Sequence, residues 1–172
     1  MAKNHTIRHA QKEDVPRIQT LLQVTWHSSY DKTLGHKKVS ELINEWHTKE
    51  RLEEDILKEN CQFLVCAEEG DIIATSFLNK QEIDAILGRM YIHPGKQNKG
   101  IGSELMKKIL SSISKETCIS LTVEPQNISA IEFYKRFGFT IQGPGSCSED
   151  PHDEIPTLIM RRPSEETAKN KT

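Results

Sequence analysis

The sequence predicts one α/β domain over residues 1–163, with a mixed, mostly antiparallel sheet and helices on both faces, followed by a polar tail at 164–172. Three observations predict this fold class. Strand-like stretches alternate with helical stretches whose apolar residues recur every three or four positions. Two strands joined by a tight turn in the first half favour antiparallel pairing. A strand–helix–strand unit in the second half favours parallel pairing, so the sheet is mixed.

The first half begins with a strand candidate at Thr6–Arg8 and a helix with an apolar face. Asp14 is the candidate N-cap, and Pro16 lies in the first turn, where a missing N–H costs little. The apolar face is formed by Val15, Ile18, Leu22 and Trp26. The pattern becomes irregular over His27–Lys38, and a second helical stretch covers Val39–Leu57 with a break near Thr48.

Strands and helices then alternate to the end of the chain. Phe63–Glu68 and Ile72–Leu78 flank a Gly70-Asp71 turn and predict a hairpin. A longer strand candidate, Ile83–Ile92, ends at His93-Pro94. A helix, a strand, a helix closed by a glycine at its C-terminal end, and two strands complete the order: Gly100–Ser114, Cys118–Val123, Ile128–Phe137 with Gly138, Phe139–Gln142 and Thr157–Met160.

Composition and charge exclude several classes of protein. Hydrophobic residues make up 35% of the 172 residues and charged residues 28%, as in ordinary globular proteins. The longest apolar run, Phe63–Ala67, is far shorter than the roughly 20 residues of a membrane helix. Met1–His5 has no apolar stretch typical of a secretion signal. The net charge of −2 argues against nucleic acid as the main partner. We therefore expect a cytoplasmic monomer or homodimer that binds neither membrane nor nucleic acid.

The cysteines and histidines predict neither a disulfide framework nor a metal site. Cys61, Cys66, Cys118 and Cys147 contain no CxxC pair, and free thiols in a reducing compartment are expected. His152-Asp153-Glu154 lacks the HExxH spacing of a zinc protease. No metal is expected to take part in the chemistry.

The most informative segment is Ile86–Leu105, in which a strand ends, a turn rich in Gly and Lys follows, and a helix begins. Its Gln97–Gly102 stretch, QNKGIG, covers the turn and the first helical turn. Glycine lets the backbone approach a ligand, and the first N–H groups of a helix, which lack internal partners, attract phosphate. The alternative is a plain turn whose glycines only relieve backbone strain. Neither GxxxxGK[ST] nor GxGxxG with a downstream acid is present.

A second motif follows the next strand. Val123–Asn127 closes that strand, and Ala130–Phe139 reads AIEFYKRFGF. With QNKGIG, these residues resemble the GNAT superfamily of acetyl-CoA-dependent N-acetyltransferases, matching its (Q/R)xxGxG/A pyrophosphate loop and its N…A..FY…GF cofactor element. More loosely, WHSSYDKTLG, the acidic second helical stretch and the closing TLIM resemble the PaiA-like spermidine/spermine acetyltransferases.

The resemblance implies the GNAT fold, in which a splayed parallel strand pair holds acetyl-CoA. The pantetheine arm would lie in a slot between Met90–Ile92 and Leu121–Val123, and backbone amides of Gln97–Ser103 would hold the pyrophosphate. Each of these roles has a structural alternative. The alternatives are sheet pairing alone for the strand residues, capping of the helix that follows for Asn127, and an exposed side chain without function for Lys135. The implied cofactor-binding residues are Met90, Tyr91, Ile92, Gln97, Asn98, Lys99, Gly100, Ile101, Gly102, Ser103, Asn127 and Lys135.

Tyr134 is the catalytic residue that the resemblance favours. Attack of an amine on the thioester expels a thiolate, which a phenol can hydrogen-bond or protonate. Reference pKa values of about 10 for Tyr and about 8.5 for a thiol make full proton transfer uphill by about 2 kcal/mol in water. Hydrogen bonding is therefore as good an account as general-acid catalysis. A helix-face aromatic of the core is the alternative.

The general base is open. A primary amine with a pKa of about 10.4 is almost fully protonated at pH 7, so something must accept its proton. Many relatives have an acidic residue just before the segment that corresponds to Met90–Ile92, whereas this chain has Ile86–Arg89 there. The candidates are Glu82, Asp84, His93 and Glu124, and a water chain to a backbone carbonyl is the alternative.

Charge patterning bears on the acceptor. The second helical stretch carries a clear excess of acids, and Glu149, Asp150, Asp153 and Glu154 precede the last strand. The resemblance places both regions on the acceptor side, with Trp26 and Tyr30 as candidate pocket residues, although solvated surfaces and core packing explain them equally. The expected function is transfer of acetyl from acetyl-CoA to a polyamine or other small primary amine by direct attack. The alternatives are a protein N-terminal or lysine acetyltransferase and a non-catalytic CoA-binding regulatory module.

Overall fold

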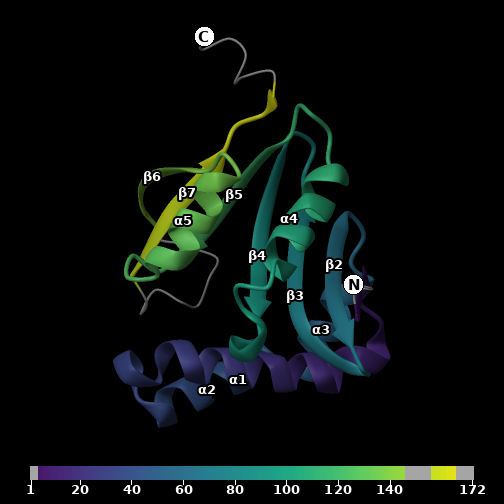
Figure 1. The fold of residues 1–172 in the computed structure, drawn as a ribbon, viewed down its shortest axis with the longest axis vertical. Coiled ribbons are helices and arrows are strands. Elements are labelled where there is room, and N and C mark those ends of the chain that lie inside the picture. The colour runs from purple at the N-terminus through teal and green to yellow at the C-terminus, as the bar shows by residue number, and fades with distance from the viewer. Residues whose placement is uncertain (1–3, 146–155, 166–172) are drawn as a thin grey trace. The chain divides into compact units, whose positions relative to one another are not determined.

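The computed structural model describes residues 4–145 and 156–165, with the elements labelled in Figure 1. In chain order they are β1 (His5–His9), α1 (Val15–Leu34), α2 (His36–Trp46), α3 (Lys49–Leu57), β2 (Cys61–Glu68), β3 (Asp71–Lys80), β4 (Asp84–Ile92), α4 (Ile101–Ser111), β5 (Cys118–Val123), α5 (Ile128–Arg136), β6 (Thr140–Gly145) and β7 (Thr157–Arg162). Short 3₁₀ turns at Lys12–Asp14 and Pro94–Lys96 precede α1 and α4. The predicted element order is confirmed.

The seven strands form one mixed sheet in the order β1-β2-β3-β4-β5-β7-β6. β1 is antiparallel to β2, and β7 is antiparallel to both β5 and β6. β4 and β5 are parallel, with Asp84 opposite Cys118 and Ile86 opposite Ser120. The α/β class and the mixed sheet with a parallel pair are therefore as predicted.

The chain divides into two compact units, and β4 contributes to both. The first unit contains the chain up to Leu78 together with Arg89–Leu110, and the second contains Asn79–Gly88 together with the chain from Ser111. The single domain expected over residues 1–163 stays a prediction.

The core of the first unit is built from the apolar faces that the periodicity predicts. In α1, the buried residues include Val15, Ile18, Leu22 and Trp26, and α2 buries Val39, Leu42, Ile43 and Trp46. Leu105, Met106 and Ile109 of α4 are fully buried. Apolar burial of this kind contributes about 25 cal/mol per Å². It fixes the helix that follows the predicted phosphate loop.

Several helix boundaries of the first unit differ from the prediction: α2 begins at His36 instead of Val39, and α4 is Ile101–Ser111 instead of Gly100–Ser114. α1 continues through the irregular segment to Leu34 and ends at Gly35, whose φ is +82°. The predicted break near Thr48 is confirmed, because the Thr48 Oγ1 accepts a 3.2 Å hydrogen bond from the Arg51 amide and caps α3. Asp14 occupies the N-cap position of α1, but its carboxylate accepts from the Arg8 guanidinium at 2.6 and 2.8 Å instead of capping the helix.

The second unit packs α5 against its own strands. Its core contains the buried side chains of Ile119 and Leu121 in β5, Ile131 in α5, Phe139, and Met160 in β7. α5 ends as predicted before Gly138, which adopts a φ of +84°. The Phe139 amide then donates to the Tyr134 carbonyl at 3.2 Å, so the chain turns sharply into β6.

Some predictions fall on parts of the chain that the structure does not describe. Outside the described residues lie Cys147, His152, the acidic residues Glu149, Asp150, Asp153 and Glu154, and positions 166–172 of the tail. Among the helices that are described, none has the length and apolarity needed to cross a lipid bilayer.

Candidate cofactor site

The predicted phosphate loop joins β4 to α4 within the first unit. The His93 Nδ1 accepts from the Gly95 amide at 3.1 Å, and the Gln97 side-chain amide donates to the Ile92 carbonyl at 3.2 Å. These bonds fold the loop back on the end of β4. Asn98 and Gly100 have φ values of +59° and +86°, in the left-handed region where Asn and Gly are the least strained residues.

The N-terminus of α4 is open to solvent at this loop. The first helical hydrogen bond runs from the Glu104 amide to the Gly100 carbonyl at 3.0 Å. The amides of the first turn precede that bond and have no carbonyl partner within the helix. Gln97–Gly100 are exposed, whereas Ile101 is buried beneath them. An exposed loop on a fixed helix N-terminus suits a phosphate group.

The two lysines of the loop differ in their surroundings. Lys96 is half-buried and forms an ion pair with Glu68 at the end of β2. This hydrogen bond lowers the pKa of Glu68 and raises the pKa of Lys96. Lys99 is exposed on the turn itself. Lys99 is therefore the better placed of the two to meet a phosphate in solution.

The β4 strand carries a backbone irregularity at Arg89, just before Met90. Arg89 has a φ of +46°, and its guanidinium pairs with Asp55 of α3 and lies 5.4 Å from the centroid of the Phe77 ring. The following residues, Met90–Ile92, are half-buried. The ion pair and the ring contact hold Arg89 in a conformation that is rare for residues with a side chain.

Asn127 and Lys135 of the second motif lie in the second unit, each with a local partner. The Asn127 Oδ1 accepts from the Ala130 amide at 3.1 Å, so its predicted N-cap role is observed. Lys135 donates to Glu132 of the same helix at 2.8 Å. Their contacts to the cofactor stay predictions, as does the slot between Met90–Ile92 and Leu121–Val123.

Tyr134 is almost completely buried on α5, with 9% of its surface exposed. Its ring centroid lies 5.3 Å from that of Phe133 and 5.6 Å from that of Phe139, in edge-on contacts. The ring is therefore fixed by packing. Such a fixed phenol fits both a positioned hydrogen-bond donor and the alternative of a core aromatic.

The four candidate bases differ sharply in environment. Asp84 accepts a 2.8 Å hydrogen bond from Arg161 on β7. Glu82 is exposed, and the His93 ring already accepts from a backbone amide. Glu124, directly after β5, is half-buried, and desolvation raises its pKa. Desolvation thus makes the Glu124 carboxylate a stronger base than an exposed glutamate.

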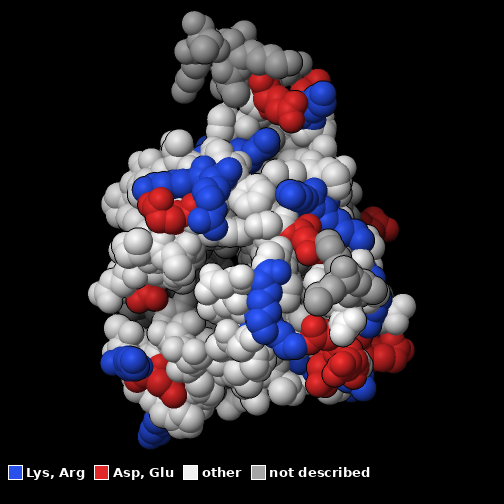
Figure 2. Space-filling model, viewed as in Figure 1, with Lys and Arg blue, Asp and Glu red and all other residues white. Residues whose placement is uncertain are grey.

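The predicted acceptor side is described only in part. Trp26 is 2% exposed and packs with its ring centroid 5.5 Å from that of Trp46 and 5.0 Å from that of Tyr30. On the face in Figure 2, acidic and basic side chains are interspersed. Among the acids of α2 and α3, ion pairs engage Glu41, Glu53 and Asp55, with partners Lys37, Lys49 and Arg89. Four further glutamates of this region are exposed: Glu45, Glu50, Glu54 and Glu59.

A cavity of about 390 Å³ in the first unit was not predicted. Residues of α1, the β2–β3 turn and the segment before α4 line it, and charged members include Arg17, Glu68, Asp71 and Lys96. No local pattern in the sequence connects these positions, because they meet only through the fold.

Known proteins share both the sequence pattern and the fold. The sequence profile of the acetyltransferase (GNAT) family matches residues 7–139. An uncharacterised N-acetyltransferase of Methanocaldococcus jannaschii is 28% identical over 149 residues, which cover 81% of this chain. The match spans 62% of the length of that curated relative.

Two solved structures have the same fold at low sequence identity. The PaiA N-acetyltransferase from Thermoplasma acidophilum, in complex with coenzyme A, has a TM-score of 0.82 and 22% identity, covering 94% of this chain and 99% of that one. The ribosomal-protein-S18-alanine N-acetyltransferase from Escherichia coli has a TM-score of 0.70 and 18% identity, covering 93% and 94%. The enzyme class and the acetyl-CoA cofactor that the sequence predicts are those of this family. Because the profile match extends over most of the chain and includes both motifs, the chain belongs to the acetyltransferase (GNAT) family.

Proposed function

We propose that this chain transfers an acetyl group from acetyl-CoA to a primary amine by direct nucleophilic attack. The observation that carries the proposal is the exposed Gln97–Gly100 loop at the N-terminus of α4. The backbone amides of Gln97–Ser103 bind the pyrophosphate, which a helix N-terminus stabilises through its partial positive charge. The backbone of Met90–Ile92 pairs with the pantetheine arm. Asn127 hydrogen-bonds that arm, and Lys135 meets an outer phosphate after leaving Glu132.

The reaction forms one C–N bond and breaks one C–S bond. The neutral amine attacks the thioester carbonyl carbon, and the resulting tetrahedral intermediate expels the thiolate of CoA. The Tyr134 phenol donates a hydrogen bond to the leaving sulfur, which stabilises its charge. No acyl-enzyme and no metal take part.

Glu124 accepts the proton of the amine in this proposal. Its half-buried position raises its pKa, so its carboxylate is a stronger base than an exposed glutamate. Asp84 is a weaker candidate because its carboxylate already accepts a hydrogen bond from Arg161. Glu124 therefore takes the role for which Ile86–Arg89, the part of β4 just before Met90, supplies no acid.

The acceptor in this proposal is a polyamine or another small cationic amine. The helices α2 and α3 carry six acidic residues against four basic ones, and this small excess of negative charge attracts cations. One observation favours a second candidate, since an enzyme named for acetylating an alanine of a ribosomal protein shares this fold. The free thiols of Cys66 and Cys118 fit a reducing compartment, so we place the reaction in the cytoplasm.

The deciding experiment measures release of the CoA thiol from acetyl-CoA with a panel of acceptors. The panel contains spermidine, spermine, a small monoamine and a peptide that carries both a free N-terminus and a lysine. Release with the polyamines supports the proposed acceptor, and release with the peptide alone supports the protein-directed alternative. Tight binding of acetyl-CoA without turnover on any acceptor would favour the non-catalytic module.

A further inference from the structure

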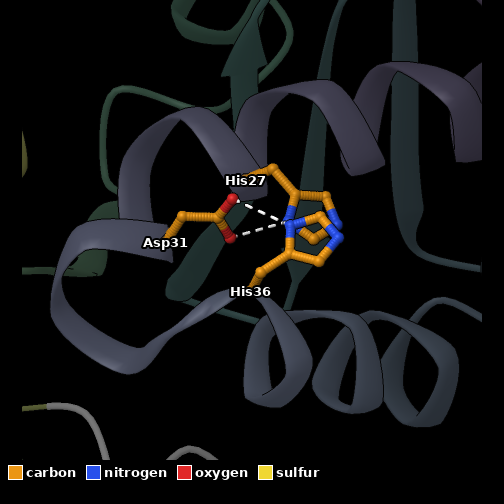
Figure 3. Close-up of side chains that lie close together, drawn as sticks. All are labelled: His27, Asp31 and His36. Atoms are coloured by element: carbon orange, nitrogen blue, oxygen red, sulfur yellow. Dashed lines mark hydrogen bonds and ion pairs between the residues drawn. The ribbon is translucent and has the colours of Figure 1, made fainter.

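Three potential metal ligands converge at the corner between α1 and α2. His27 and Asp31 lie one turn apart on α1, and His36 is the first residue of α2. Figure 3 shows both imidazole rings turned toward the same carboxylate. The His27 Nδ1 lies 2.7 Å from the Asp31 Oδ1, and the His36 Nδ1 lies 3.0 Å from the Asp31 Oδ2.

The cluster is held together by the local fold. Gly35, with a φ of +82°, reverses the chain between the helices, and its amide donates to the Asp31 carbonyl at 3.0 Å. The two imidazole rings stack with centroids 4.2 Å apart and planes 23° apart. The three ligand atoms lie within 4.8 Å of one another. The geometry therefore brings two nitrogens and one carboxylate to a single point.

Ser40 supplies a second observation about His27. The Ser40 Oγ donates to the His36 carbonyl at 2.9 Å and lies 3.5 Å from the His27 Nε2. The His27 Nδ1 donates the 2.7 Å hydrogen bond to Asp31, because a carboxylate only accepts. A metal ion on Nδ1 would replace that proton and leave neutral His27 protonated on Nε2, beside the Ser40 Oγ. Metal-binding histidines commonly have this arrangement, with the second ring nitrogen held by a neighbouring polar group.

We propose that His27, Asp31 and His36 bind one divalent transition-metal ion through the two Nδ1 atoms and the carboxylate. Two imidazoles and one carboxylate suit Zn²⁺, which takes three protein ligands and leaves a fourth position for water. Metal–ligand bonds of about 2.0–2.2 Å in tetrahedral geometry place neighbouring ligand atoms roughly 3.4 Å apart. The two contacts of 2.7 and 3.0 Å to Asp31 must therefore lengthen by about 0.4–0.7 Å. His36, with its side chain 75% exposed, has room for that shift.

The proposed site is independent of the acetyltransferase proposal. The sequence reading selected no metal ligands, and none of these three residues belongs to the cofactor motifs. Bound metal would join the end of α1 to the start of α2 and stabilise the corner between them.

The test is a Zn²⁺ titration of chelator-treated full-length protein, followed by calorimetry and by thermal unfolding. We expect one Zn²⁺ per chain and a rise in Tm. His36→Ala, at an exposed position, and Asp31→Asn should each lower the affinity at least about tenfold, since even changes around metal ligands cost about 10–100-fold. His9→Ala, at an exposed histidine outside the cluster, should bind as the original protein does.

Co²⁺ substitution separates this site from the cysteine thiols. Co²⁺ bound by nitrogen and oxygen ligands gives visible d–d bands without a thiolate charge-transfer band, and these bands should vanish in His36→Ala. The proposal is wrong if Zn²⁺ shows no saturable binding, or if His36→Ala and His9→Ala bind it equally. A Co²⁺ spectrum dominated by thiolate charge transfer would also overturn it.

Discussion

At the scale of single residues, the Tyr134→Phe variant distinguishes the catalytic role of the Tyr134 hydroxyl from the packing role of its ring. The ring is packed between Phe133 and Phe139, and phenylalanine keeps that packing. We expect Tyr134→Phe to lower kcat by about 10²-fold or more, in the range of a lost acid or hydrogen-bond donor. Binding of acetyl-CoA and the Tm should change little. Steady-state kinetics with calorimetric binding measure both, and full activity in the variant would remove Tyr134 from the mechanism.

Glu124 gives a prediction about pH. Burial raises its pKa, so the carboxylate that accepts a proton forms at a higher pH than in an exposed glutamate. The acid limb of kcat/KM should therefore have its midpoint above the reference value of about 4.3. Glu124→Gln should lower the rate above that midpoint and remove that limb. Glu116→Gln, at an exposed position of the same unit, is the matched control and should keep the profile of the original protein.

The same shift has a consequence for stability. A carboxyl whose folded pKa is raised stabilises the fold fully below its unfolded pKa, and this contribution is lost as pH rises through the folded value. At neutral pH the ionised Glu124 carboxylate lowers the free energy of unfolding. Glu124→Gln should therefore leave the free energy of unfolding equal or higher. A variant that is much less stable at neutral pH would show that the carboxylate makes a favourable contact.

At the scale of secondary-structure elements, periodicity and capping predicted most of the helices and strands. The apolar spacing of Val15, Ile18, Leu22 and Trp26 marks the buried face of α1, and Thr48 marks the start of α3. The end of α1 was not predicted, because polar residues over His27–Leu34 hide the helical period. Backbone irregularities such as Arg89 depend on contacts with Asp55 and Phe77, which are distant in sequence. The sequence pattern does not predict the cluster of His27, Asp31 and His36 for a similar reason, because the cluster forms only where Gly35 reverses the chain.

The phosphate loop can be tested as an element through Gly100. A Cβ at this position would meet nothing within 4 Å, so Gly100→Ala acts only through the positive φ of +86°. We expect a loss of stability of about 1–2 kcal/mol from the left-handed conformation. The affinity for acetyl-CoA should fall as well, because the strain is relieved by moving the amides that bind the pyrophosphate.

Gly70→Ala is the matched control for this prediction. Gly70 has a φ of +91° and equally open surroundings, but it lies in the turn between β2 and β3. Both variants should lose similar stability in denaturant unfolding. Only Gly100→Ala should lose cofactor affinity, and an equal loss in both would mean that general destabilisation, not the loop, explains the effect.

At the scale of the whole molecule, the two cofactor motifs fall in different compact units. Gln97–Ser103 belongs to the first unit, and Asn127, Tyr134 and Lys135 belong to the second. The sequence predicted each motif because glycines, aromatics and an N-cap residue follow one another within a short stretch. It did not predict the division of the chain, because that depends on which strands and helices pack together. It also left four candidate bases, since the desolvation that raises the pKa of Glu124 is a property of the fold.

The acceptor preference is also a property of the whole molecule, because it depends on summed charge. Replacing the exposed Glu45, Glu50, Glu54 and Glu59 by Gln removes four negative charges from α2, α3 and the segment that follows. If this region attracts a cationic acceptor, the KM for spermidine should rise several-fold at low salt, and the difference should shrink as ionic strength screens the charges. The dissociation constant for acetyl-CoA and the KM for an uncharged hydrophobic amine should stay the same. A control that neutralises exposed Glu13 and Glu116 changes net charge elsewhere, and an equal rise in KM there would show that total charge, not this acidic region, governs the acceptor.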